Sequence, residues 1–162
     1  NEVCMKIRLM SLLAALFIVC MFGSAASEVT EFKNFSADVP SGWNSNESGN
    51  EMGSMVLLMA PGNKCVVTIA LQPSGGMPAK DLATMSAQAL KGEAPEKVDG
   101  SEAYAFNATI NGMKTITRVQ ENEGTVLVFT VAGDEAANKD AIKSICESMD
   151  SKDAKIKALL KK

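Results

Sequence analysis

The sequence predicts a single α+β domain with one sheet that carries helices on its faces. Most of the chain after residue 27 consists of segments in which apolar and polar residues alternate, as they do in half-buried strands. Short turn signals join successive segments as hairpins, so the strands are expected to be antiparallel. Two stretches of helical periodicity complete the pattern. No repeat or linker divides this part of the chain, which we assign as one domain (28–150) and a basic amphipathic tail (151–162).

The amino-acid composition excludes several classes of enzyme and metal site. The 162 residues are 46% hydrophobic and 22% charged, as in an ordinary globular protein. There is no histidine, which excludes Ser-His-Asp and Cys-His nucleophile systems and histidine-containing zinc sites. An enzyme that uses carboxylates or a Ser/Lys pair is the alternative that remains. No known motif of that kind is present, so we predict a non-enzymatic protein with no catalytic, cofactor-binding or metal-binding residue.

The first segment, residues 1–27, has the pattern of upstream residues followed by a secretory signal peptide. We take Met5 as the start, followed by a basic stretch from Lys6 to Arg8 and an apolar run from Leu9 to Phe22. Small residues then lead to a cleavage site before Glu28 or just upstream of it. An uncleaved leader that tethers the protein is the alternative, but a membrane-spanning helix needs about 20 apolar residues.

Lipidation is a second alternative, because Cys20 lies within the apolar run. A lipidated cysteine needs a small residue directly before it, and Val19 occupies that position. This disfavours a lipoprotein. We therefore expect export to the periplasm or the extracellular space of a bacterium.

The net charge of the chain disfavours one class of partner. Residues 1–27 carry a net charge of +1 within a chain of −3, so the remaining chain carries −4. A mildly acidic chain disfavours a nucleic-acid partner, which would require a clustered basic surface. We expect an envelope protein or a small ligand as partner. Membrane contact is expected only through the leader, or weakly through the basic tail.

The first elements after the leader are predicted to be extended. Val29 to Val39 forms strand-like chain, with three apolar side chains on one face: Phe35, Ala37 and Val39. Residues 40–42 end this strand, and the polar stretch 44–53 is expected to be a loop by its composition. A hairpin follows, with strands at 54–60 and 64–72. Its second strand places four residues on one face: Cys65, Val67, Ile69 and Leu71.

A helix is predicted from Pro78 to Lys91, since proline favours the first helical position and Gly92 is suited to the stop. Its buried stripe is expected to consist of Leu82, Met85 and Ala89.

The second half of the domain begins with the strongest hairpin signal in the chain, Asn111-Gly112. The segment 125–132 is apolar on both faces and should be central in a sheet covered on both sides. Asp134 is expected to cap a C-terminal helix, whose apolar stripe is Ile142, Ile145, Cys146 and Met149. We interpret the Lys-rich tail as a frayed, solvated end of that helix.

One short segment resembles a known family. Residues 35–43 read Phe-Ser-Ala-Asp-Val-Pro-Ser-Gly-Trp, in which a strand ends at proline, glycine reverses the chain and tryptophan closes the core. This resembles the opening of PsbP-like and Mog-type domains, above all that of small exported bacterial proteins related to DcrB. The order of elements agrees over residues 31–150. The resemblance implies an antiparallel sheet sandwiched by helices and a non-catalytic accessory or binding role. It carries over no site residue, because no ligand motif is shared.

Two cysteines remain after the leader, Cys65 and Cys146, and both lie on predicted apolar faces. In an oxidising compartment they could form a disulfide that stabilises the domain by roughly 4 kcal/mol. The alternative is two buried free thiols that do not meet, because a disulfide requires Cα atoms within about 7 Å.

Two other groups of residues resemble ligand sites only weakly. Met52, Met55 and Met59 suggest a soft copper site, but the last two share strand parity with Leu57, so we interpret them as core. The acidic residues around Asp99-Gly100 lack the spacing of a calcium loop and are interpreted as a solvated turn.

The surface that we expect to contact a partner lies where the polar stretch meets the end of the sheet. It comprises Trp43, Asn44 and Asn46.

Overall fold

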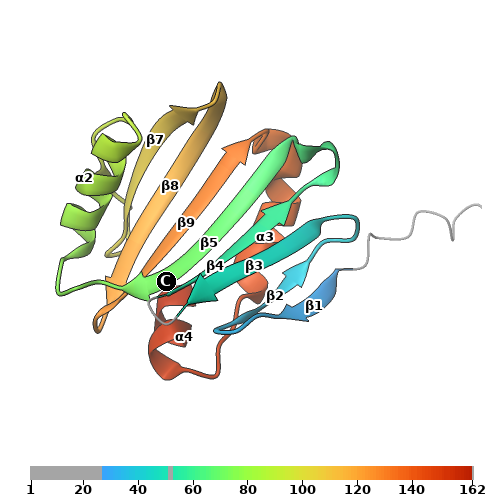
Figure 1. The fold of residues 1–162 in the computed structure, drawn as a ribbon, viewed down its shortest axis with the longest axis horizontal. Coiled ribbons are helices and arrows are strands. Elements are labelled where there is room, and N and C mark those ends of the chain that lie inside the picture. The colour runs from blue at the N-terminus through green and yellow to red at the C-terminus, as the bar shows by residue number, and fades with distance from the viewer. Residues whose placement is uncertain (1–26, 51–52, 162) are drawn as a thin grey trace, which may run out of the picture.

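The computed structural model describes residues 27–50 and 53–161, and within them it forms a seven-stranded antiparallel sheet with the strand order β3-β4-β5-β9-β8-β7-β6 (Figure 1). A separate two-stranded ribbon pairs β1 with β2. The strands are β1 (Glu28–Glu31), β2 (Ser36–Val39), β3 (Asn44–Asn50), β4 (Gly53–Met59), β5 (Cys65–Pro73), β6 (Glu96–Lys97), β7 (Tyr104–Ile110), β8 (Met113–Asn122) and β9 (Thr125–Gly133). The helices are α2 (Ala79–Ala89), α3 (Lys139–Ser148) and α4 (Ala154–Leu160), with 3-10 turns η1 (Pro61–Asn63) and η2 (Ala136–Asn138).

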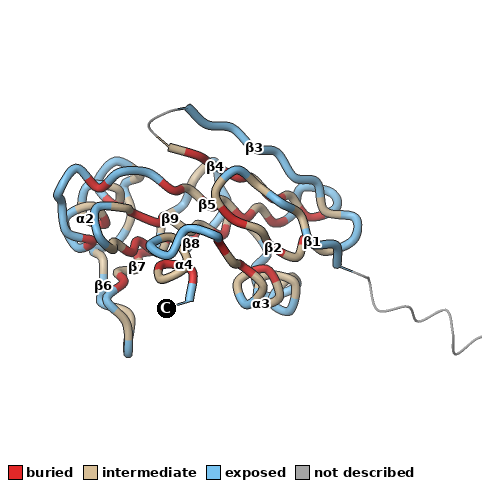
Figure 2. Tube along the Cα trace, turned by 90° about the horizontal axis from the view of Figure 1, so that it is seen from below, coloured by how far each residue is buried: buried red, intermediate tan, exposed pale blue. Residues whose placement is uncertain are grey.

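Helices cover both faces of the sheet. Helix α2 packs over β7 and β8 on one face, whereas α3, α4 and the β1–β2 ribbon lie on the other (Figures 1 and 2). Strand β9 lies in the middle, and its successive residues Val126 and Leu127 belong to the cores on opposite faces. The predicted α+β class, with an antiparallel sheet sandwiched by helices, is confirmed, as is the central place of the segment 125–132.

The larger core lies between the sheet and the two C-terminal helices. The alternating faces predicted for the first strand and for β5 are both buried there: Phe35, Ala37 and Val39 on one, and Cys65, Val67, Ile69 and Leu71 on the other. The turn at Asn111-Gly112 has φ angles of 51° and 80°, the two positive values that a type I′ turn requires. These elements follow the sequence because the period of two and the turn chemistry act locally.

The polar stretch that follows Trp43 is a strand and not the loop that we expected. Its residues form β3, an edge strand whose seven residues are all exposed (Figure 2) and which pairs along its full length with β4. Composition was misleading because an edge strand exposed on both faces needs no apolar side chain. The backbone hydrogen bonds to β4 supply its order.

The C-terminal tail also differs from the expectation of a frayed, solvated end. Residues 154–160 form the separate helix α4, which Asp153 caps by accepting from the amides of Lys155 and Ile156. Leu159 is 1% exposed and Leu160 is 8% exposed, and both belong to the larger core. The outer face of the tail is therefore basic, and its inner face packs into the larger core.

The stripe predicted for the first helix is not the one that is buried. The residues of α2 that are buried against the sheet are Ala79, Ala83 and Ala87, whereas Met85 is 55% exposed. The small alanines allow the helix to lie close to β7 and β8, and Leu82 packs at the edge of the contact. The helix ends near the expected place, but Lys91 and not Gly92 adopts the positive φ that closes it.

The leader, Met5 and Cys20 lie outside the described residues. Within residues 27–50 and 53–161, no helix has the length and apolar character needed to cross a membrane.

Candidate functional site

The three residues of the expected partner surface differ in how far they are buried. The Trp43 side chain is half-buried and packs against the larger core. Asn44 and Asn46 are exposed on β3, directly opposite Met59 and Leu57 of β4, and share with them the outer face of the sheet. Trp43 therefore supports the core, and its role in partner contact remains a prediction, as do those of the two asparagines.

Both cysteines are free thiols in the structure. Cys65 on β5 is fully buried, and Cys146 on α3 is half-buried against the same core. Burial is the main cause that raises the pKa of each thiol above its ordinary value. The two side chains thus contribute to the core as small apolar groups, and the disulfide remains a prediction.

The methionines of β4 are not the core residues that we expected. Met55 is 44% exposed, and the buried face of β4 consists of its even-numbered residues, among them Val56 and Leu58. Met52 lies outside the described residues. Elsewhere Met77, Met85 and Met113 are also exposed. In the described part of the chain, no group of three acidic or cysteine side chains is placed to hold a metal ion.

The acidic turn near Asp99 is stabilised by a surface ion pair. Lys97 donates to both carboxylate oxygens of Glu102 at 3.1 Å, and both side chains are more than half exposed. The Glu102 carboxylate is therefore engaged with a neighbouring cation on the outside of the turn.

A cavity of about 280 Å³ lies between the sheet and the two C-terminal helices. Strands β8 and β9 form its floor, α3 and α4 form its walls, and apolar side chains make up most of its lining. Those from β9 are Leu127, Phe129 and Val131, and those from the helices include Ile142, Met149 and Leu159. The cavity exists because α3 covers β2 and α4 covers β8 and β9, so the two helices leave a space between them.

Two polar side chains of β8 enter this apolar lining. Arg118 and Gln120 occupy alternate positions on the strand and so share its cavity face, together with Ile116. Gln120 is only 3% exposed, and its Oε1 accepts a hydrogen bond from Nη2 of Arg118 at 3.4 Å. The same nitrogen donates to Oγ of Ser101 at 3.5 Å. Gln120 and Ser101 are therefore two of the side chains that hold the guanidinium at the cavity.

The charge of Arg118 acts inside the cavity. Cys146 contributes to the lining, and burial is the largest cause that raises the pKa of its thiol. The positive charge of Arg118 opposes this rise, whereas the nearby Glu147 adds to it. Arg118 therefore lies close enough to act on the wall formed by α3.

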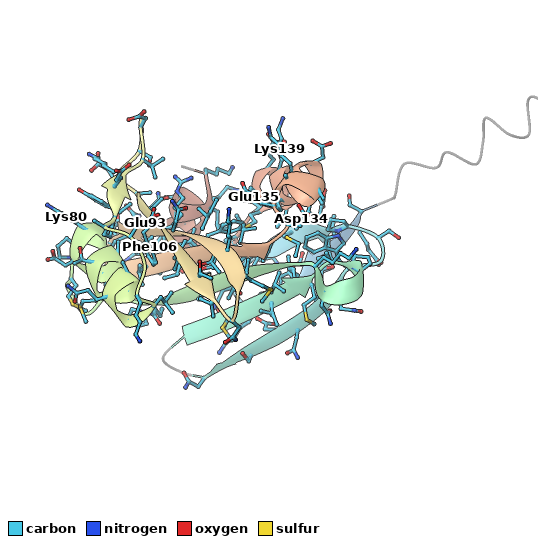
Figure 3. All side chains as sticks on the ribbon, turned by 90° about the horizontal axis from the view of Figure 1, so that it is seen from above. Lys80, Glu93, Phe106, Asp134, Glu135 and Lys139 are labelled. Atoms are coloured by element: carbon cyan, nitrogen blue, oxygen red, sulfur yellow. The ribbon has the colours of Figure 1, made fainter. Side chains whose placement is uncertain are left out.

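An open hollow of about 910 Å³ adjoins the cavity and shares Ile116, Val131 and Glu135 with it. The hollow carries charges of both signs, with Glu93 on the side of α2 and Glu135 beside α3 (Figure 3). Together the two spaces make one groove that is polar at its mouth and apolar inside.

The carboxylates at the mouth are partly occupied by structural contacts. Glu93 accepts a hydrogen bond from Nδ2 of Asn107 at 2.9 Å, and Oδ1 of Asp134 accepts from the amide of Ala137 at 3.0 Å. Asp134 is therefore not the cap of α3 that we expected, because Asn138 holds that position, and its carboxylate instead binds an amide of the 3-10 turn η2 that precedes the helix. These contacts hold two of the acidic groups in place at the end of the sheet.

Sequence reasoning missed the cavity and its two polar residues. A signal for them exists on β8, where Ile116, Arg118 and Gln120 alternate with Thr115, Thr117 and Val119, which face the α2 side. Neither face of that strand is purely polar, which is typical of a strand covered on both sides. An arginine and a glutamine at covered positions point to an internal polar site.

Comparisons with known proteins give distant structural likenesses. No family model matches the sequence, and no curated protein matches it. Among solved structures, the chain is similar to the solution structure of cyanobacterial PsbP (CyanoP) from Synechocystis sp. PCC 6803, at 13% identity and a TM-score of 0.49, over 80% of this chain and 95% of that chain. The resemblance stated for residues 35–43 includes PsbP-like domains, and the likeness to proteins related to DcrB stays a prediction.

A second similar structure is a crystal structure from Bacteroides thetaiotaomicron VPI-5482, at 12% identity and a TM-score of 0.45. The match covers 74% of this chain and 46% of that one, so the chain spans less than half the length of this protein. No residue role is carried over from either structure.

Proposed function

We propose that this protein is an exported, non-enzymatic binding module of the bacterial envelope, and that the cavity between the sheet and α3 and α4 receives an apolar group of its ligand. The observation that supports the proposal is the cavity itself, about 280 Å³ of space lined mainly by aliphatic side chains. Sites for drug-sized ligands start at about 300 Å³. A space slightly below that size suits a small molecule or one short chain.

The physical basis of such binding is the removal of apolar surface from water. Each buried methylene group contributes roughly 0.8 kcal/mol. Phe129 and Leu127 on the floor and Ile142 on the wall offer contacts on opposite sides of an inserted chain. A flexible aliphatic group of a few carbons would gain enough from these contacts to bind measurably at millimolar concentration.

The experiment is an NMR titration with 1-hexanol, a neutral chain that fits the cavity. Amide shifts should change in a saturable manner and be largest at the lining residues, such as Phe129 and Ile142. Ile116→Trp, at the 41% exposed rim position, should obstruct the entrance and weaken hexanol binding about tenfold, the equivalent of about 1.4 kcal/mol.

The matched control is Met113→Trp. Met113 lies on the same strand, is 38% exposed and has odd parity, so the added indole would lie on the opposite face of the sheet. This variant should bind hexanol as the unchanged protein does. Shifts that do not saturate, or that spread evenly over the surface, would overturn the proposed binding site.

Export is tested separately, by the mass of the product made from the full chain in a bacterium. Loss of about 27 N-terminal residues, as a signal peptide predicts, would support export. A product of full mass would contradict cleavage and favour the tethered alternative.

A further inference from the structure

We infer that the ligand of this cavity carries an uncharged carbonyl group at one end of its aliphatic chain, and that the side-chain amide of Gln120 donates a hydrogen bond to the carbonyl oxygen. This inference rests on the proposed function, because it assigns a ligand class to the same cavity. It goes further in that it gives the ligand a polar group and gives the protein a residue that selects it.

The side-chain amide of Gln120 has a defined orientation. Its Oε1 accepts a hydrogen bond from Nη2 of Arg118 at 3.4 Å. A guanidinium carries donors only, so the amide oxygen and not the amide nitrogen must face it. The Nε2 group, with its two N–H donors, therefore lies on the side of the amide away from that contact.

The Nε2 group of Gln120 is a donor that a ligand can use. It makes no hydrogen bond to any residue that the structure describes. Gln120 is only 3% exposed and contributes to the cavity lining, and its Nε2 is not sealed off by the surrounding atoms. A buried N–H group without an acceptor costs free energy, which a ligand that brings an oxygen atom recovers.

Gln120 lies at the inner end of the cavity. Ile116 and Val131, a cross-strand pair of β8 and β9, line both the cavity and the outer hollow and so mark its mouth. Gln120 pairs with Leu127, and neither of these two residues lines the hollow. The four residues from Ile116 to Gln120 span about 13 Å of strand. A ligand whose oxygen reaches Gln120 therefore lays its aliphatic chain along the floor toward the mouth.

The surroundings of Gln120 favour an uncharged acceptor. Leu127 opposite it, and Met149 and Leu159 elsewhere in the lining, are all buried. Moving an ion from water into such surroundings costs more than one neutral amide donor returns. A hydroxyl group brings a donor of its own, whereas Oε1 of Gln120 already accepts from Arg118. A carbonyl oxygen only accepts, so it satisfies the amide and leaves no new donor unpaired.

The first experiment is an NMR titration of the unchanged, isotope-labelled protein with 2-hexanone, a neutral chain with its carbonyl group near one end. One of the two Nε2 protons of Gln120 should shift downfield in a saturable manner, with the same midpoint as the backbone amide of Phe129 on the floor. The matched control is the side-chain amide of Gln88, exposed on α2 over the opposite face of the sheet, which should not shift. Saturable shifts at Phe129 without one at Nε2 of Gln120 would overturn the inference and leave the proposed function standing.

The second experiment compares 2-hexanone with 1-hexanol in Gln120→Glu. This substitution keeps an acceptor for Arg118 but removes the donor. Binding of 2-hexanone should weaken about tenfold, as expected when one buried hydrogen bond is lost and its donor is replaced by an acceptor. Binding of 1-hexanol should stay within about twofold, because its hydroxyl group can donate to the carboxylate. The matched control is Gln88→Glu, the same change of charge on α2, and it should leave both probes within about twofold.

The variants also give results that would contradict the inference. An equal loss of both probes in Gln120→Glu, or 2-hexanone binding that this substitution leaves unchanged, would overturn it. A loss of similar size in Gln88→Glu would mean a general effect of charge and would overturn it as well. If neither probe binds the unchanged protein, the proposed function fails too. Should Gln120→Glu melt far below the unchanged protein, the Nε2 signal of the unchanged protein decides the question.

Discussion

The backbone of Ser36 pairs with that of Asp150 through two hydrogen bonds, one from each amide to the other's carbonyl, at 2.8 Å and 3.0 Å. This isolated bridge joins β2, near the start of the domain, to the turn between α3 and α4. Two side chains reinforce it, as Oγ of Ser151 donates to the carbonyl of Asn34 at 2.6 Å and the amide of Asp38 donates to Oγ of Ser148 at 2.8 Å. These hydrogen bonds thus join β2 and the residues before it to the segment between α3 and α4.

Replacing Ser151 with alanine should destabilise the domain by about 1 kcal/mol, because the carbonyl of Asn34 loses its buried donor. Ser151 is only 8% exposed, so water replaces the hydroxyl poorly. The free energy of unfolding from urea titration measures the effect. Ser45→Ala, on the exposed edge strand β3, is the control and should change it by less than about 0.5 kcal/mol. Equal values for the two variants would contradict the role of this fastening.

Leu159→Ala should cost about 2–5 kcal/mol, because the side chain is 1% exposed and its removal leaves a void in the larger core. A tail that is frayed and solvated would instead tolerate the change. The control is Lys152→Ala, at an exposed position before α4. Urea unfolding that showed no difference between Leu159→Ala and Lys152→Ala would contradict the packing of α4.

The ion pair between Asp150 and Lys157 predicts a dependence of stability on pH. The hydrogen bond from Lys157 lowers the pKa of the Asp150 carboxyl below its ordinary 3.8, and the backbone of Ser151 acts in the same direction. Because the folded pKa is the lower one, the stabilisation is present above the ordinary value and is lost as the pH falls through the folded pKa.

Urea midpoints measured from pH 7 down to pH 2 test this dependence. Above about pH 4, the urea midpoint of the unchanged protein should be higher than that of Asp150→Asn. In stronger acid the two midpoints should converge. A constant difference at every pH would contradict the effect of the carboxylate charge.

The two thiols should react slowly in the folded protein and both should react after unfolding. Burial raises the pKa of Cys65 and of Cys146, so less thiolate is present at pH 8 than in an ordinary cysteine. Cys146 should react first with iodoacetamide because it is half-buried at the cavity, and bound hexanol should slow it. Mass spectrometry counts the added groups, and Cys146→Ser identifies the faster site. Unfolded, unreduced protein that takes up no label would establish the disulfide instead.

The parts of the fold that follow from the sequence are those set by local chemistry. The type I′ turn at Asn111-Gly112 needs only two residues with positive φ, and β9 is recognisable because both of its faces are apolar. Strand β4 shows the limit of such reasoning, because its residues 55–59 are all apolar and both parities can form a core. The face of β4 that becomes core is the one that the ribbon and the helices cover. Ser54 lies on that face, and its Oγ accepts a hydrogen bond from Asn34 at 2.6 Å.

The candidate site was not predictable for a related reason. Arg118 and Gln120 become cavity residues only because α4 lies across β8 and β9, and that helix comes from a segment distant in sequence. Edge strand β3 was missed because its order comes from pairing with β4 and not from its own side chains. In both cases the property belongs to a tertiary arrangement that a single segment does not encode.

The fastening of residue 34 to residue 151 also governs when the domain can be completed during synthesis. The two positions are 117 residues apart, and the helices that cover Phe35, Ala37 and Val39 are made after all the described strands. Until then the ribbon lacks its contacts with α3 and with the turn after it, and contacts of such high sequence separation form late. The ribbon is thus the first described element to be made and one of the last to be packed.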